Sequence, residues 1–168
     1  SQGAASQGIA NTLRQQGGNY NAMKQYNIAD HCYSEALGIY RDISRGVASQ
    51  NVAHTLRCQG SNYNAMKQYM NADQCYNKTL AIQREISHGA ASVDLAKTLS
   101  IKGVNYYLMK QHSDAEQCFT EAVAIYRELA QAVSRDKAQT LRCQGLNYTV
   151  MKKYKDADQC YAEAQAIY

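Results

Sequence analysis

The segment Thr55–Tyr69 reads TLRCQGSNYNAMKQY, and its pattern occurs four times along this chain of 168 residues. The other copies begin at Thr12, Thr98 and Thr140, so the starts are 43, 43 and 42 residues apart. The copy at Thr12 is nearly identical, and the other two are looser. A fixed period in this range indicates a repeat protein, in which each unit buries its apolar face against its neighbour. We therefore expect function to lie on a surface that several repeats build together.

Two helices are predicted in each repeat. In the second repeat, apolar or small residues recur at steps of three and four over Ser49–Met66 and again over Asn71–Ser87, which is helical spacing. The chain contains no proline, which favours uninterrupted helices. Gly46 and Gly89 are expected to form turns between repeats, because glycine takes the left-handed conformation easily. The third such turn, at residues 131–136, lacks glycine.

We predict one all-α array over residues 1–168. Its opening residues SQGAAS resemble later repeat material at Gly89–Ser92, so the chain is expected to be part of a longer array. The predicted repeat boundaries are 4–45, 47–88, 90–131 and 133–168.

The six cysteines fall on two repeat positions. Equivalent positions in neighbouring repeats lie on the order of 10 Å apart, which exceeds disulfide reach. Free thiols are therefore expected, and they favour a reducing compartment, so the predicted location is cytoplasmic. No metal site is expected, because no Cys-x-x-Cys pair exists and the histidines lack ligand spacing. The first of these repeat positions holds Cys32, Cys75, Cys118 and Cys160, and the second holds Cys58 and Cys143.

Other classes of function find little support in the sequence. The formal net charge is +4, no basic run resembles a nucleic-acid-binding tail, and no apolar run approaches a membrane span. The glycines are spaced by repeats and form no phosphate-binding loop. Asp73 and Glu85 are read as solvated charges rather than as catalytic acids. We predict no enzyme, no catalytic residue, no cofactor, no nucleic acid and no membrane partner.

Glycine recurs inside the first helix of every repeat, where it costs about 1 kcal/mol relative to alanine. We expect each glycine to allow the second helix to approach closely, with the alanine twelve residues later as its partner. An aromatic residue four positions beyond that alanine is expected to fill the core. These glycines are Gly17, Gly60, Gly103 and Gly145.

Two polar positions also recur in each repeat. An asparagine in the first helix is predicted to bond a neighbouring backbone, in preference to reading a ligand. An acidic residue near the start of the second helix is predicted to favour the positive end of that helix. The positions are Asn19, Asn62, Asn105 and Asn147, and Asp30, Asp73, Glu116 and Asp158.

The repeat resembles the tetratricopeptide repeat, and the resemblance covers essentially the whole chain. In the first repeat the resemblance rests on Leu13, Gly17, Tyr20, Ala29, Tyr33 and Ala36, and the other repeats match closely, with Thr79 in place of the last alanine in the second. The longer period is similar to the variant of kinesin light chains. HEAT and armadillo repeats share the period but not this arrangement. The resemblance implies an α-solenoid of four helix-turn-helix repeats in a right-handed superhelix.

The chain departs from this family at two positions. The family usually has a bulky apolar residue before the glycine, and it usually closes the repeat with proline. Here the first position holds Gln16, Gln59, Lys102 and Gln144, and the second holds Arg41, Arg84 and Arg127.

The resemblance implies that the first helices line a concave groove. Arg14, Arg57 and Arg142 share one repeat position, so an acidic extended or helical peptide is the expected ligand of a scaffold or adaptor. Chaperone-tail binding is not expected, because Gly18, Cys58 and Ile101 replace its carboxylate clamp. The residues expected to face the groove are Asn11, Arg14, Asn21, His54, Arg57, Asn64, Lys97, Tyr107, Gln139, Arg142 and Thr149.

Three alternatives stay open. In the first alternative, the groove residues are ordinary solvated polar side chains. The second is a structural or self-assembling array whose ends stack head to tail. The third is an engineered repeat protein with no dedicated peptide ligand, which the near-identity of the first two repeats would fit.

Overall fold

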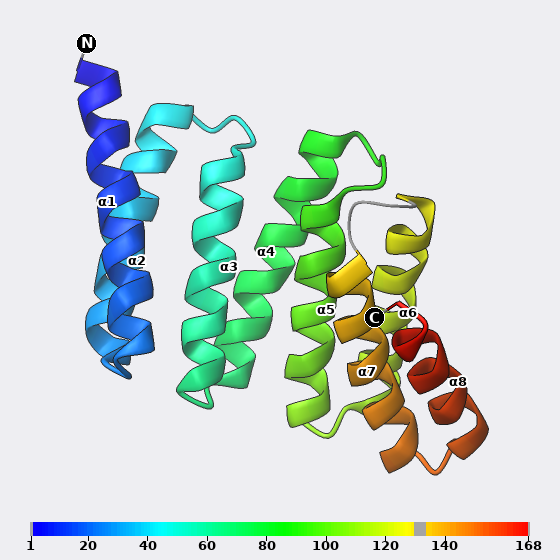
Figure 1. The fold of residues 1–168 in the computed structure, drawn as a ribbon. Helices are drawn as coiled ribbons and strands as arrows, with labels where there is room; N and C mark the ends of the chain where they lie inside the picture. The colour runs from blue at the N-terminus through cyan, green and yellow to red at the C-terminus, as the bar shows by residue number, and fades with distance from the viewer. Residues whose placement is uncertain (1, 130–133, 168) are drawn as a thin grey trace. The chain divides into compact units, whose positions relative to one another are not determined.

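The computed structural model describes residues 2–129 and 134–167, and in these ranges it contains eight α-helices and no strand (Figure 1). The predicted all-α fold of helix-turn-helix repeats is thus confirmed. Of the predicted third inter-repeat turn, residues 131–133 lie outside the described ranges. The helices are α1 (Gln2–Ala22), α2 (Tyr26–Ser44), α3 (Gln50–Ala65), α4 (Tyr69–Ser87), α5 (Val93–Leu108), α6 (His112–Glu128), α7 (Ser134–Val150) and α8 (Tyr154–Gln165).

The helices form two compact units, divided between His88 and Gly89. Unit 1 contains the hairpins α1–α2 and α3–α4, and unit 2 contains α5–α6 and α7–α8. In unit 1, α3 packs against α2 and also approaches α1, whereas the backbones of α2 and α4 lie farther apart. In unit 2, α7 packs against α6 and approaches α5, whereas the backbones of α6 and α8 lie farther apart and these helices meet only through long side chains. Within each unit, the second helices of the two hairpins therefore diverge, and the first helices stay together.

The turn inside each hairpin has the same geometry in all four repeats. Lys67 follows α3 with φ of 60°, in the left-handed region, and its amide bonds the carbonyl of Asn64 at 2.9 Å. The amide of Gln68 reaches back to the carbonyl of Tyr63 at 2.8 Å. These two bonds form a Schellman motif, which satisfies carbonyls at the end of the helix. Because the motif takes so few residues, α4 begins at Tyr69, two residues before the predicted start.

The turns between hairpins use the predicted glycines. Gly46 and Gly89 both have φ of 82°, which favours glycine. The residue before each glycine is also left-handed, with φ of 49° at Arg45 and at His88. Within unit 1, the chain therefore turns from α2 into α3 through two consecutive left-handed residues, Arg45 and Gly46.

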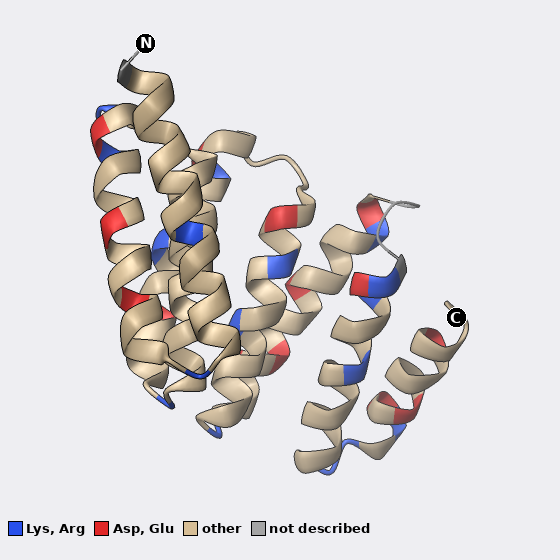
Figure 2. Ribbon diagram, turned by 60° about the vertical axis from the view of Figure 1, so that its left-hand side comes forward, with Lys and Arg blue, Asp and Glu red and all other residues tan. Residues whose placement is uncertain are grey.

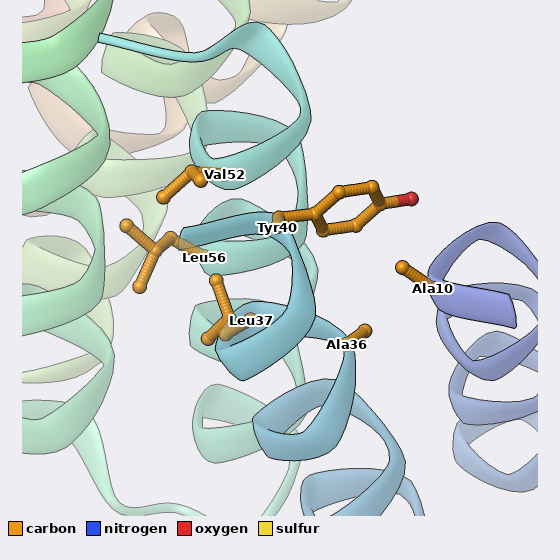
Figure 3. Packing of buried hydrophobic residues seen from close by; sticks show 6 residues of the cluster. All are labelled: Ala10, Ala36, Leu37, Tyr40, Val52 and Leu56. Atoms are coloured by element: carbon orange, nitrogen blue, oxygen red, sulfur yellow. The ribbon is translucent and has the colours of Figure 1, made fainter. Parts of the chain in front are cut away.

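The core of unit 1 lies between α1, α2 and α3 (Figure 3). Leu37 on α2 lies near Leu56 and Val52 on α3, and Ala36 and Tyr40 face Ala10 on α1. Each buried leucine stabilises the fold by about 1.5–3 kcal/mol relative to exposure. The core of unit 2 is built in the same way, from Val123 of α6, Ala138 and Leu141 of α7, and Cys160 and Ala164 of α8.

Candidate functional site

The glycines of the first helices face aromatic rings. A Cβ atom on Gly60 would lie 2.7 Å from Cε1 of Tyr76, closer than real contacts allow. Gly17, Gly103 and Gly145 meet the equivalent rings in the same way. The predicted close approach of the second helix is confirmed. The nearest group to each glycine is the aromatic ring sixteen residues later, which from the sequence was expected only to fill the core.

An asparagine joins each described pair of successive hairpins within a unit. Asn62 of α3 donates from Nδ2 to the carbonyl oxygen of Tyr26 at 2.9 Å, and its Oδ1 accepts a bond from Asn21 at 2.8 Å. In unit 2, Asn147 donates to the carbonyl oxygen of His112 at 2.9 Å, and its Oδ1 lies 2.9 Å from Nδ1 of the same histidine. The predicted structural role of this position is confirmed at both residues.

A second polar link uses the glutamine that precedes the glycine. Gln59 is 7% exposed and donates from Nε2 to Asp30 at 2.8 Å and to Ser34 at 3.1 Å, both on α2. The thiol of Cys75 on α4 approaches Oε1 of Gln59 at 4.0 Å. The glutamine thus connects three helices, where an apolar residue would connect them by packing alone.

The equivalent link in unit 2 is centred on Gln144, which donates to Thr120 at 3.0 Å and accepts from the Cys160 thiol at 3.7 Å. Beside it, Lys153 binds both carboxylate oxygens of Glu116, at 2.9 and 3.1 Å. Asp30 and Glu116 therefore join successive hairpins, and the role predicted for them at the helix end was wrong.

In unit 1, several predicted groove residues already contact other parts of the protein. Asn11 accepts a hydrogen bond from the hydroxyl of Tyr40 at 2.6 Å, and Asn21 donates to Asn62. Arg14 and Arg57 both lie close enough to Cys58 to oppose the rise in its pKa that burial causes. The first-helix side of unit 1 thus brings two arginines from successive hairpins around one half-buried thiol. His54 and Asn64 are half-buried on the same helix, α3.

The predicted residues of unit 2 make a different surface. Lys97 of α5 pairs with Asp136 of α7 at 3.1 Å, which links the two first helices. Tyr107 packs edge-on against His112, with ring centroids 5.6 Å apart. Arg142 bonds Gln139 at 3.5 Å, and Thr149 bonds the carbonyl of Gly145 at 2.9 Å.

All six cysteines are free thiols, as predicted. Four are buried, and Cys58 and Cys143 are half-buried. Burial raises the pKa of the Cys75 thiol to about 11, so this sulfur stays protonated at neutral pH. A protonated buried thiol is a poor nucleophile, and the cysteines therefore act as small core residues.

A groove that the sequence did not predict lies between the diverging second helices of each unit. Its floor is the first helix of the later hairpin, and its ten lining positions are equivalent in the two units. The cavity measures about 350 Å³ in unit 1 and about 210 Å³ in unit 2. In unit 1 it is lined by Ser34, Leu37, Arg41, Leu56, Gln59, Tyr63, Asn71, Gln74, Cys75 and Lys78. In unit 2 it is lined by Thr120, Val123, Arg127, Leu141, Gln144, Tyr148, Asp156, Gln159, Cys160 and Glu163.

We name these the second-helix grooves. The two positions at which the sequence departs from the tetratricopeptide pattern meet in them, since each groove contains one of the glutamines and one of the arginines. The recurrence of these glutamines and arginines in the sequence could have pointed to a shared site. The divergence of α2 from α4 was still needed to show that a groove exists. Figure 2 shows charged residues spread along both helices of the hairpins, with basic residues at turns between paired helices.

Antiparallel hairpins joined by a repeated set of polar and apolar contacts define a helical repeat protein. Residues 51–128 match the family model of the tetratricopeptide repeat, so the predicted resemblance to that family is confirmed. No curated protein sequence matches the chain.

Solved structures share the fold at low sequence identity. BtubC (BKLC) from P. vanneervenii has 21% identity and a TM-score of 0.86, over 94% of this chain and 62% of that chain. A Rap protein complexed with competence and sporulation factor has 18% identity and a TM-score of 0.82, over 99% and 43%. The nearly identical TPR-like repeats of a putative kinesin light chain from Podosopora anserina have 14% identity and a TM-score of 0.74, over 94% and 74%. The chain thus spans less than two thirds of two of these proteins.

The described residues also lack two features that would indicate other classes of function. None of the helices there is both long and apolar enough to cross a membrane. No group of three or more His, Cys, Asp or Glu side chains in residues 2–129 and 134–167 is placed to hold a metal ion.

Proposed function

We propose that the protein is a protein–protein interaction scaffold that binds an acidic peptide or helix along the first-helix side of its hairpins. The observation that carries this proposal is the position of Arg14 and Arg57, which come from successive hairpins and both act on Cys58. Two guanidinium groups so placed favour a carboxylate ligand, which each can bind through two parallel hydrogen bonds. The free thiols support a cytoplasmic location for this scaffold.

The contacts within each unit refine the proposed ligand surface. Three of the predicted residues form hydrogen bonds or ion pairs within the chain, so their role is to hold this surface in place rather than to bind the ligand. They are Asn11, Asn21 and Lys97. Arg142 is exposed and bonds only weakly to Gln139, which leaves its guanidinium able to meet a ligand. We therefore propose that Arg14, Arg57 and Arg142 select for acidic side chains in the ligand.

A peptide array followed by fluorescence polarisation tests the proposal. Bound peptides are expected to be enriched in Asp and Glu. Arg57→Ala is expected to weaken the best peptide by about 1–3 kcal/mol, because a charge-assisted hydrogen bond is lost. Arg45→Ala, which removes an equal charge at an exposed turn, is the matched control and is expected to leave the affinity unchanged. Equal binding of acidic and basic peptides would remove the basis for the proposal.

A structural array that assembles end to end is the second candidate. One face of α1 is exposed at the repeat positions whose equivalents in α3 are buried against α2. Ile9 is 56% exposed whereas the equivalent Val52 is 6% exposed, and Asn19 is exposed whereas Asn62 is completely buried. This face of α1 could therefore pack against the second helix of a hairpin in another molecule, as α3 packs against α2.

Light scattering over a concentration series tests self-assembly. The mass is expected to rise with concentration, and Ile9→Asp is expected to keep the protein monomeric, because a charge cannot be buried in an apolar contact. A strictly monomeric mass at high concentration would rule this candidate out. Peptide binding is expected to be the same in Ile9→Asp, which separates the two candidates.

A further inference from the structure

The second-helix grooves of the two units differ in charge at equivalent positions. In unit 2, Glu163 of α8 lies between two cations. Its carboxylate bonds Nη2 of Arg127 at 2.6 Å and Nζ of Lys137 at 2.8 Å. A carboxylate of the protein itself therefore fills the basic end of this groove.

Unit 1 lacks that carboxylate. Arg41 stands at the position of Arg127, but Lys78 stands at the position of Glu163, and Val52 stands at the position of Lys137. Both Arg41 and Lys78 line the groove, and none of its lining residues is acidic. The other three repeats have glutamate where the second has Lys78, at Glu35, Glu121 and Glu163. The second repeat thus replaces the internal partner of Arg41 with a second cation.

Asp30, a carboxylate near the floor of this groove, lies well away from Arg41. Asp30 accepts a hydrogen bond from Gln59 at 2.8 Å and also interacts with the hydroxyl of Tyr63. It precedes Arg41 by eleven residues of α2, which is roughly 16 Å along a helix. The groove of unit 1 therefore has a basic end at Arg41 and Lys78, with polar side chains along its length. It is also the larger groove, at about 350 Å³ against about 210 Å³.

We propose that the second-helix groove of unit 1 binds a carboxylate side chain of an acidic protein segment, held between Arg41 and Lys78. The internal pair of unit 2 shows the geometry that the ligand reproduces, since Arg127 already binds Glu163 there through Nη2 and Nε. This site lies on the side of the hairpins opposite to the ligand surface proposed above, and it stands independently of that surface.

The test uses the whole chain, labelled with ¹⁵N, and two short peptides capped at both ends. One peptide contains two adjacent glutamates, and the other contains glutamines in their place. The glutamate peptide is expected to shift the Nε–H resonance of Arg41 and the amide resonance of Lys78, and the glutamine peptide is expected to shift neither. Equal shifts with both peptides, or none with either, would overturn the proposal.

Two variants of unit 1 test the residues directly. Arg41→Gln is expected to weaken binding by about tenfold, because a charge-assisted bond is lost. Lys78→Glu restores the acid that the other repeats carry, and it is expected to abolish binding while leaving the urea unfolding midpoint unchanged or higher. Full binding by Lys78→Glu would contradict the proposal.

Two variants of unit 2 complete the test. Arg127→Gln removes a guanidinium that is already paired, so the affinity of unit 1 is expected to stay the same. Glu163→Lys removes the internal partner of Arg127 and places a second cation beside it, and a second equivalent of glutamate peptide is expected to bind at Arg127. Failure of Glu163→Lys to bind, in a folded variant, would show that the charge pattern is not sufficient and would overturn the proposal.

The two ligand surfaces are distinguished by their resonances. Shifts at Arg41 and Lys78 that persist in Arg57→Ala support this groove whatever the outcome for the first-helix side. Shifts confined to Arg57 and its neighbours would support the proposed function and overturn this inference.

Discussion

Asn62 of α3 donates a 2.9 Å hydrogen bond to the carbonyl oxygen of Tyr26, the first residue of α2. Asn147 makes the same bond to His112 in unit 2. Both asparagines are completely buried. The carbonyl at the start of a second helix is thereby tied to the first helix of the next hairpin, so these bonds fix how successive hairpins stack within each unit.

Asn62→Ala is expected to lower the free energy of unfolding by about 2 kcal/mol, because the carbonyl of Tyr26 and the amide of Asn21 lose the partner that the completely buried Asn62 supplies. Asn19→Ala is the matched control, since Asn19 holds the same repeat position but is exposed, and its effect is expected to stay within about 0.5 kcal/mol. Urea unfolding of both variants measures the difference. Equal losses would mean that the asparagine acts through the helix itself rather than between hairpins.

Gly60→Ala is expected to destabilise the protein by about 1–3 kcal/mol, because the new Cβ would meet the ring of Tyr76. That ring is completely buried. Gly38→Ala in α2 is the control, since nothing lies within 4 Å of its Cβ position, and it is expected to stabilise by up to about 1 kcal/mol. Thermal unfolding reports both, and a gain in Gly60→Ala would refute the packing argument.

Lys67→Gly is expected to stabilise the protein by about 1 kcal/mol, because Lys67 has φ of 60° and glycine takes this conformation without steric cost. The same change at Lys78, in the middle of α4, is expected to cost about 1 kcal/mol. In chemical denaturation, the free energy of unfolding should therefore rise for Lys67→Gly and fall for Lys78→Gly. A loss at Lys67 would show that its side chain stabilises the turn.

Glu163 is expected to make stability depend on pH in the acid range. The hydrogen bond from Arg127, with a further contribution from Lys137, holds the pKa of Glu163 below its usual value of 4.5. A depressed pKa stabilises the folded state above the unfolded pKa, and this stabilisation is lost as the pH falls through the folded pKa. The unfolding midpoint of the wild type should thus approach that of Glu163→Gln between about pH 5 and about pH 2. A constant difference over that range would contradict the pairing.

The sequence was sufficient to predict the hairpins and the free thiols. The period of the segment at Thr55 gave the repeat, and helical spacing gave the helices to within two residues at Tyr69. The role of Asn62 followed from its recurrence, because a residue that recurs at one repeat position serves a contact wherever two hairpins stack. The close contact of Gly60 with the ring of Tyr76 did not follow, since two helices of known length can pair in several registers and only packing selects that ring.

The sequence by itself determined the local structure and the repeat, because hydrophobic spacing and turn residues act within one or two helical turns. The tertiary structure decided what the polar residues do. Gln59 connects three helices, and Arg41 and Lys78 line one groove, only because α3 packs against α2 while α4 diverges from it. Such contacts join residues about one repeat apart in the chain, and their geometry depends on the angle at which whole hairpins pack.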